Sequence, residues 1–204
     1  MFQFTTIKAD GTTGARRGTF HTGHGDVDTP AFMPVATQGT VKGMTPHDLR
    51  SVGASIILAN AYHLYLRPGV DLIKKAGGLH KFMGWDGPIL TDSGGYQVFS
   101  LSSLFRVEED GVKFRSHLNG SLHKLTPEDV VFVQERLGVD IAMVLDECLP
   151  REVDFETAQK SASLTLRWAE RSLKARAAAD QALFAIVQGG MFPQLRKENA
   201  SSLA

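Results

Sequence analysis

Cysteine is nearly absent from this chain, which carries Cys148 alone among its 204 residues. A single cysteine excludes an internal disulfide, and it cannot form the cysteine clusters of structural zinc sites. The seven histidines are scattered, so no Cys/His spacing predicts a zinc site either. We therefore expect no metal site in this chain, and the sparing use of cysteine favours a cytoplasmic protein.

Net charge is absent as well, because 22 Lys and Arg residues balance 22 Asp and Glu residues. Zero net charge argues against a broad electrostatic grip on nucleic acid, although it does not exclude a local basic patch. No apolar run is long enough to cross a membrane, and residues 1–10 lack the basic-then-apolar pattern of a signal peptide. With no low-complexity segment and no clear linker, the simplest prediction is one domain without a membrane partner.

Short apolar runs that end on a polar residue recur along the chain. Runs of this kind are typical of strands buried on both faces, which usually means a parallel sheet. The runs are 32–37, 56–60, 88–92, 141–146 and 184–188.

Helical patterns lie between these runs. Thr45-Pro46 and Thr126-Pro127 each offer an N-cap threonine and a proline at the first helical position. The two helices should stop at Gly53 and Gly138, and a third helix is expected over residues 154–177.

Alternation of strands and helices, with all polar tips at one chemical end, predicts an α/β fold of the TIM-type (β/α)₈ class. A doubly wound open sheet shares the alternation, but it would normally show a glycine-rich turn after its first strand. Residues 32–38 contain no such turn.

The expected strands account for about five of the eight that a barrel requires. Residues 1–30 predict an N-terminal β-hairpin around Asp10-Gly11, and residues 107–125 predict an inserted hairpin with its turn at Asn119-Gly120. The sequence ends in a helical pattern from Pro193 without a stop signal. We therefore expect residues 1–204 to be the N-terminal part of a single catalytic barrel domain, incomplete here.

The candidate chemistry lies at the strand ends. One of the two carboxylates, Asp92 and Asp146, could transfer protons while the other binds an edge of the substrate. The alternative is that either one caps a helix. Gln188 adds an acceptor and two donors, and Tyr96 could cover a ring by stacking. Core packing for Tyr96 and a loop-fixing role for Gln188 remain open. Carboxylates and amides converging on a flat pocket suit a purine with the edge of guanine. Cys148 has no histidine near it in sequence, so lining a pocket is favoured over acting as a nucleophile.

Four segments together resemble one family. They are TDSGGYQV (91–98), NAYHLYLRPG (60–69), DECLP (146–150) and IVQGG (186–190). The chain is similar, from Thr29 onward, to the tRNA-guanine transglycosylases, also called queuine tRNA-ribosyltransferases. The resemblance implies a modified TIM barrel, a pentosyltransferase that replaces guanine at the wobble position of tRNA with a deazaguanine in queuosine biosynthesis. The DECLP segment resembles the branch that inserts 7-aminomethyl-7-deazaguanine.

The resemblance also implies roles for individual residues. Asp92 would be the general acid/base for the departing and incoming bases, and Tyr96 would stack on the base. Asp146 would grip the Watson–Crick edge, Gln188 would bind the base from the side, and Cys148 would line the pocket. Ser93, Gly94 and Gly95 would line it too, and Val35 and Asn60 match positions near the flipped nucleotide.

The implied mechanism is a double displacement at C1′ of ribose, in which a carboxylate attacks and a covalent ribosyl-enzyme awaits the new base. The family's nucleophilic aspartate and its structural Cys₃His zinc site would lie beyond Ala204. We therefore expect this chain alone to be inactive, and the full-length protein to bind zinc and form a homodimer.

Two other interpretations remain open. One is a barrel glycosidase that uses Asp92 and Asp146, and the other is a non-catalytic tRNA-binding subunit related to the family. Affinity for guanine separates the glycosidase from the transglycosylase, because a glycosidase pocket has no reason to hold a purine.

Overall fold

The computed structural model describes residues 2–101 and 105–204. The chain divides into two compact units. Unit 1 comprises Met1–Thr91, Gln134–Ala142 and Ala178–Ala182, and unit 2 comprises Asp92–Val133, Met143–Ala177 and Leu183–Ala204. Among the described helices, none combines the length and the apolar character needed to cross a membrane. The single-domain organisation expected from the sequence stays a prediction.

A five-stranded sheet contains all the strands that the apolar runs predict. Its order is β11-β10-β6-β5-β4. The bounds are β4 (Val35–Ala36), β5 (Ile57–Asn60), β6 (Ile89–Asp92), β10 (Ile141–Met143) and β11 (Ala182–Phe184). Val35 pairs with Leu58 and Ile141 pairs with Leu90, both in parallel register.

The strand order is consistent with the TIM-type winding expected from the sequence. Successive strands of this sheet lie side by side without a reversal, as in a TIM-type fold, whereas a doubly wound sheet reverses its order at a switch point. Every strand is shorter than its apolar run. The difference is largest at β4, where Pro34 directly precedes Val35 and has no N–H to donate to a ladder.

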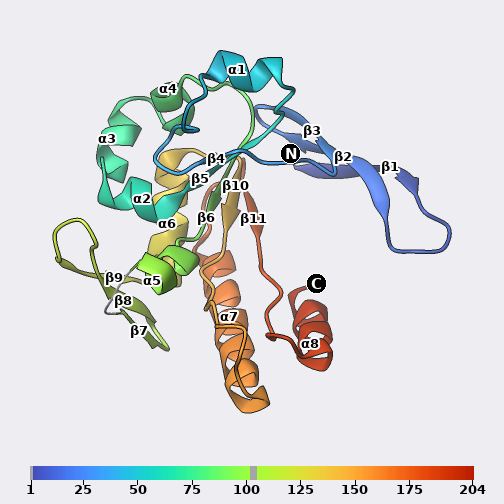
Figure 1. Cartoon of the computed structure of the whole chain (residues 1–204), viewed down its shortest axis with the longest axis vertical. Helices are drawn as coiled ribbons and strands as arrows, with labels where there is room; N and C mark the ends of the chain where they lie inside the picture. The colour runs from blue at the N-terminus through green and yellow to red at the C-terminus, as the bar shows by residue number, and fades with distance from the viewer. Residues whose placement is uncertain (1, 102–104) are drawn as a thin grey trace. The chain divides into compact units, whose positions relative to one another are not determined.

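The N-terminal hairpin of unit 1 is confirmed and carries one strand more than expected. It consists of β1 (Gln3–Ala9), β2 (Arg16–Thr22) and β3 (Gly25–Thr29), and Figure 1 shows the three strands in blue. Both pairings are antiparallel. The Asp10 carboxylate accepts hydrogen bonds from the backbone N–H groups of Thr12 and Thr13, which shapes the first turn.

Unit 1 also holds the helices that follow β4 and β5. They are α1 (Pro46–Ser51), α2 (Ala61–Leu66), α3 (Val70–Lys75) and α4 (Leu79–Met83). The expected start of α1 is confirmed, because Thr45 and Asp48 form a reciprocal capping box. Gly53 has a φ of 79°, a left-handed conformation that ends the helix segment at little steric cost for glycine.

The helix expected after Thr126 is α6 (Pro127–Leu137), and its start is confirmed as well. The Asp129 carboxylate accepts from the Thr126 backbone N–H at 2.9 Å, and the Thr126 hydroxyl accepts from the Asp129 N–H at 3.1 Å. The helix ends at Leu137, and Gly138, whose φ of 70° is left-handed, follows it before β10 begins.

Unit 2 contains the inserted hairpin, which again has one strand more than expected. Its strands are β7 (Phe105–Glu108), β8 (Gly111–Arg115) and β9 (Leu122–Leu125). The predicted turn at Asn119-Gly120 is confirmed, with Gly120 at a φ of 73°. An additional turn, which was not expected, lies at Glu109-Asp110, directly before Gly111.

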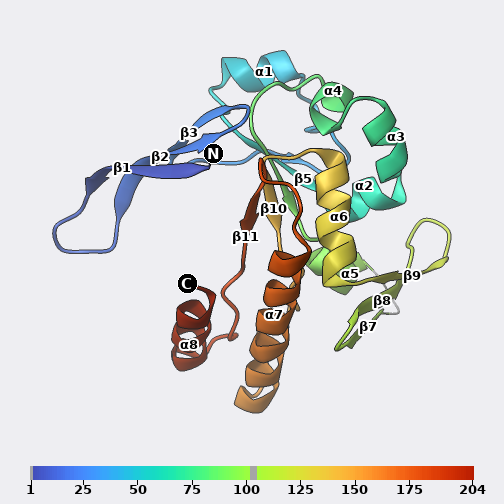
Figure 2. The ribbon, with the colours of Figure 1, turned by 180° about the vertical axis from the view of Figure 1, so that it is seen from behind.

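The long helix α7 (Phe155–Ala175) begins at Asp154, whose carboxylate accepts from the Thr157 N–H. The helix expected over residues 154–177 is confirmed, and its buried face is made mainly of small residues. Phe155 and Leu173 are 41% and 63% exposed, while the small side chains and Trp168 are buried. Helix α8 (Pro193–Leu203) lies beside α7, as Figures 1 and 2 both show, and the Asn199 amide donates to the Ala162 carbonyl.

Candidate active site

A buried carboxylate, Asp146, is the centre of the site, and all the contacts described around it lie within unit 2. The Ser93 hydroxyl donates to Asp146 Oδ1 at 3.1 Å, and the Gln188 amide donates from Nε2 to Oδ2 at 2.8 Å. The Cys148 thiol approaches the same Oδ2 at 3.9 Å. Both oxygens of the carboxylate are therefore fixed in direction by side chains from three different parts of the sequence.

The turn after β6 brings the backbone against this carboxylate. Asp92 is the last residue of β6, and Gly95 begins α5 (Gly95–Leu101). A Cβ at Gly95 would lie 2.6 Å from the Asp146 carbonyl oxygen and 3.0 Å from Asp146 Oδ1. Since real Cβ atoms do not approach so closely, the position requires glycine. Gly94 has a φ of 84°, a left-handed conformation that favours glycine, and this explains the first glycine of Gly94-Gly95.

Gln188 is held by helix α8. Its backbone N–H donates to Asn199 Oδ1 at 2.9 Å, and Asn199 is itself buried against α7. At Gly189 a Cβ would lie 2.7 Å from the backbone nitrogen of Arg196, so α8 packs directly on the backbone beside Gln188. The amide that binds Asp146 is thus preorganised by the packing of α8.

Burial raises the pKa of the two acidic groups in the site. It raises the pKa of Asp146, although the hydrogen bonds from Ser93 and Gln188 favour the charged form and oppose the shift. It also raises the pKa of Cys148 to about 11, and the neighbouring Asp146 carboxylate adds to the effect. The Cys148 thiol is therefore protonated at neutral pH, which supports a lining role over a nucleophilic one.

The structure brings together most of the residues predicted from the sequence. Ser93, Gly95, Cys148 and Gln188 surround Asp146. Asp92 is confirmed as a strand end, whereas Asp146 lies three residues after β10 and Gln188 four residues after β11, because both strands stop early.

Tyr96 lies in the first turn of α5 and is 60% exposed, so packing in the core, the alternative weighed for it, is wrong. One further polar group was missed. The side-chain oxygen of Gln97 is buried without a hydrogen-bond partner in the described residues, although Gln97 stands inside the TDSGGYQV segment.

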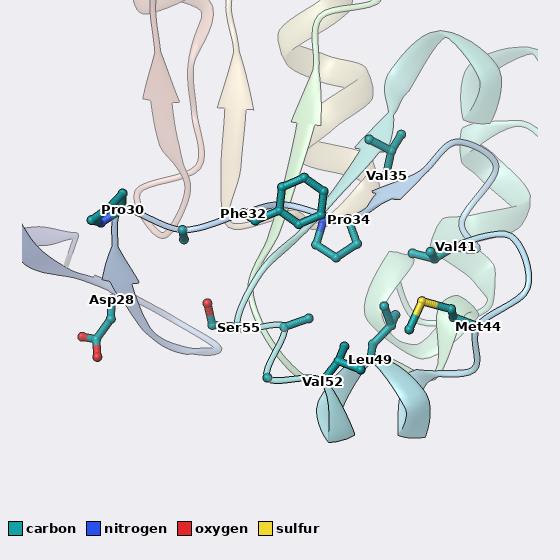
Figure 3. A pocket seen from close by; sticks show the side chains of 13 residues that line it. Asp28, Pro30, Phe32, Pro34, Val35, Val41, Met44, Leu49, Val52 and Ser55 are labelled. Carbon is teal, nitrogen blue, oxygen red and sulfur yellow. The ribbon is translucent and has the colours of Figure 1, made fainter.

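A separate pocket of about 680 Å³ lies in unit 1 (Figure 3). Phe32 and Pro34 lie together at its upper side, while Met44, Leu49 and Val52 face it from around α1. Val35 lines this pocket, whereas Asp92, Asp146 and Gln188 do not. Its apolar lining offers little acid–base chemistry, so the carboxylate site of unit 2 is the better candidate for catalysis.

The set of groups around Asp146 defines what it can bind. A carboxylate accepts two hydrogen bonds side by side, and the neighbouring amide of Gln188 can donate or accept. A flat molecule with two adjacent N–H groups complements that arrangement.

Comparison with known proteins decides the family. The model of the family described as TGT: Queuine tRNA-ribosyltransferase matches residues 10–204. The chain belongs to the queuine tRNA-ribosyltransferase family. Among curated members, it is 56% identical over 202 residues to a queuine tRNA-ribosyltransferase of Thermoanaerobacter sp. (strain X514). It is 57% identical to those of Thermoanaerobacter pseudethanolicus and Caldanaerobacter subterraneus subsp. tengcongensis.

Each of these alignments covers 98% of this chain but 54% of the relative. The chain therefore spans about half the length of the curated queuine tRNA-ribosyltransferases that it matches. The resemblance identified from the four sequence segments is confirmed at the level of the family.

Proposed function

We propose that this chain forms the base-recognition part of a transglycosylase that exchanges guanine at the wobble position of tRNA for a 7-deazaguanine. The observation that carries the proposal is the buried Asp146 carboxylate, oriented by Ser93 and Gln188. Guanine presents N1–H and an exocyclic NH₂ on one edge, which matches the two acceptor oxygens of a carboxylate. Family membership supports the same substrate class.

The chemistry proposed for the complete enzyme is a double displacement at C1′ of ribose. Attack by a carboxylate breaks the bond from C1′ to guanine, and the incoming base then displaces that carboxylate, so that two inversions give net retention. Asp92, at the end of β6, would supply a proton to the departing guanine and take one from the incoming base. By the resemblance, the nucleophile would lie in the part of the relatives that this chain does not span.

Further points of the proposal follow from the resemblance and from the sequence. The incoming base would be 7-aminomethyl-7-deazaguanine in queuosine biosynthesis, Tyr96 would stack on the base, and the complete enzyme would be a cytoplasmic homodimer. The structural zinc of the family calls for three cysteines and a histidine, a donor set that a chain with one cysteine does not fit. We assign that zinc to the remaining half of the relatives and derive no step from it.

A chimera provides the direct test of this function. Residues 1–204 would be joined to the portion of the Thermoanaerobacter sp. (strain X514) relative that follows the matched region. We expect the chimera to incorporate labelled guanine into tRNA. The Asp92→Ala variant should lose roughly 10²–10⁴-fold in exchange rate, because a proton-transfer group is removed, while its thermal unfolding stays cooperative.

Two results would contradict the proposal. One is a chimera that unfolds cooperatively but exchanges no guanine, and the other is an Asp92→Ala chimera that exchanges at the wild-type rate. Hydrolysis of aryl glycosides by the chimera without guanine exchange would favour the glycosidase interpretation instead.

A further inference from the structure

Two histidines and a buried aspartate converge in unit 1, and none of them belongs to the carboxylate site. His24 Nδ1 lies 2.8 Å from Asp140 Oδ1, and His80 Nε2 lies 3.2 Å from Asp140 Oδ2. The two imidazole rings stack with their centroids 3.6 Å apart. We call His24, His80 and Asp140 the His₂Asp cluster.

Sequence spacing could not reveal this cluster. His24 is in the turn between β2 and β3, His80 is on α4, and Asp140 directly precedes β10. His24 and Asp140 are 116 residues apart, and His80 and Asp140 are 60 apart. The expected absence of a metal site in this chain rested on short Cys/His spacings, whereas the fold brings these distant donors together.

The distances within the cluster are close to those that a metal ion imposes. Two donors bound at about 2.1 Å to a tetrahedral ion lie about 3.4 Å from each other. The two N···O distances are 2.8 and 3.2 Å, and all three ligand atoms lie within 4.8 Å of one another. Small shifts of the side chains would therefore complete the coordination. One of the two stacked imidazoles must tilt out of the stack to bind the ion. We expect His24 to do so, because its side chain is 44% exposed.

The Asp140 carboxylate is buried and held in one direction, which suits the binding of a cation. Its side chain is 1% exposed, and its Oδ2 also accepts the backbone N–H of Ile89 at 2.9 Å, which fixes its direction. The carboxylate therefore offers oxygen ligands in a fixed direction beside the nitrogen atoms of two imidazoles.

Access and a fourth ligand are available next to the cluster. A pocket of about 460 Å³ is lined by both histidines together with Arg50, Trp85 and the backbone of Gly138, among others. The guanidinium of Arg50 is paired with Asp86 and lies 5.2 Å from the centroid of the Trp85 ring, so part of the positive charge around the pocket is compensated. Water in this pocket can occupy an open coordination position.

We propose that the His₂Asp cluster binds a divalent transition-metal ion of the zinc class through three protein ligands, with water in the fourth position. Two imidazoles and one carboxylate suit Zn²⁺ or Co²⁺, whereas Ca²⁺ and Mg²⁺ require mostly oxygen ligands. These ligands, two histidines and one aspartate, differ from the three cysteines and one histidine of a Cys₃His site. The ion would join the turn between β2 and β3, helix α4 and the start of β10, three segments far apart in the sequence.

The test uses the untagged chain of residues 1–204, stripped with a chelator and titrated with CoCl₂ and, separately, ZnCl₂. We expect one Co²⁺ per chain, visible absorption bands of four-coordinate Co²⁺, and no thiolate charge-transfer band from Cys148. Binding should raise the melting temperature by roughly 5–10 °C at a hundredfold excess over the dissociation constant.

Matched variants identify the ligands. His24→Gln should weaken Co²⁺ binding at least tenfold, and His80→Gln should do the same. His47→Gln, which alters an exposed histidine on α1, should leave affinity and stoichiometry unchanged. Because His24 is partly exposed in a turn, its variant should keep the fold, whereas a change at the buried Asp140 could disturb folding for other reasons.

Three results would overturn the proposal. They are a wild-type chain that takes up no Co²⁺, a His24→Gln chain that binds as tightly as the wild type, and a Co²⁺ spectrum with a thiolate band that disappears in Cys148→Ser. Any of them would leave the cluster as a hydrogen-bonded contact between the β2–β3 turn and its neighbours.

Discussion

Asp146→Asn should separate ligand recognition from stability in this site. The substitution keeps the size of the side chain but turns one acceptor oxygen into a donor amide. Ser93 can still donate to the remaining oxygen, and the Gln188 amide can turn and accept from the new NH₂ group, so both contacts survive as neutral hydrogen bonds. Loss of charge in two hydrogen bonds costs about 2 kcal/mol, and relief of the buried charge offsets much of that cost. We expect the free energy of unfolding to change by about 1 kcal/mol or less.

Binding of guanine should respond much more strongly. The new amide places N–H groups against the N–H edge of the base, which leaves polar atoms unpaired at a cost of about 2–4 kcal/mol. That energy corresponds to a loss of roughly 30- to 700-fold in affinity, measured by isothermal titration calorimetry with guanine. A loss below about threefold would remove Asp146 from the binding pocket.

The pH dependence of the same variant provides an independent check. Because burial raises the folded-state pKa of Asp146, its contribution to stability is present below its ordinary value of 3.8 and is lost as pH rises through the folded-state pKa. The difference in urea-unfolding free energy between wild type and Asp146→Asn should therefore move in favour of the variant as the pH rises above 3.8. A constant difference from pH 3 to pH 8 would show that the carboxylate is not desolvated.

Two further predictions concern the turn at α5 and an ion pair of unit 2. Gly95→Ala should push the backbone away from Asp146, costing about 1–3 kcal/mol of stability by urea unfolding and weakening guanine binding, whereas Gly14→Ala, with open space around its Cβ, should do neither. Equal effects of the two variants would refute the close approach. Glu128 accepts two hydrogen bonds of 2.7 Å from Arg171, and this pairing lowers its pKa from 4.5 to about 2. The pairing stabilises the fold by about 1 kcal/mol after screening by solvent, and this stabilisation is present above pH 4.5 and lost toward pH 2. The free energy of unfolding of Glu128→Gln, measured with urea, should therefore fall less than that of the wild type between pH 4.5 and pH 2. An equal fall in both proteins would contradict the pairing.

The strand pattern of the fold could be predicted from the sequence because its signals are local. An apolar run followed by a polar residue identified β5, β6, the beginning of β10 and the last residue of β11, and threonine-proline pairs identified the starts of α1 and α6. Strand length was overestimated because apolar character continues into loops that are buried for other reasons. One strand of each small sheet was missed because only one turn was expected in each segment, whereas further turns lie at Gly23-His24 and Glu109-Asp110.

The candidate site was predictable to the extent that its residues follow strand ends. Asp92, Asp146 and Gln188 were identified in this way, and the structure joins two of them directly by the hydrogen bond from Gln188 to Asp146. The role of Asn199 in holding Gln188 could not be inferred, because it depends on how α8 packs. Long-range packing likewise creates the His₂Asp cluster, for which the sequence has no motif.

The most direct test of the central claim is a comparison of guanine with hypoxanthine, which lacks the exocyclic amino group. If the Asp146 carboxylate accepts from both N–H groups of the base edge, removing one of them sacrifices a charged hydrogen bond worth about 1.5–3 kcal/mol. Calorimetric titration of the chain should therefore give guanine an affinity about 10- to 100-fold higher than that of hypoxanthine. Equal affinities for the two bases would contradict the account, because the buried carboxylate would then not be reading the guanine edge.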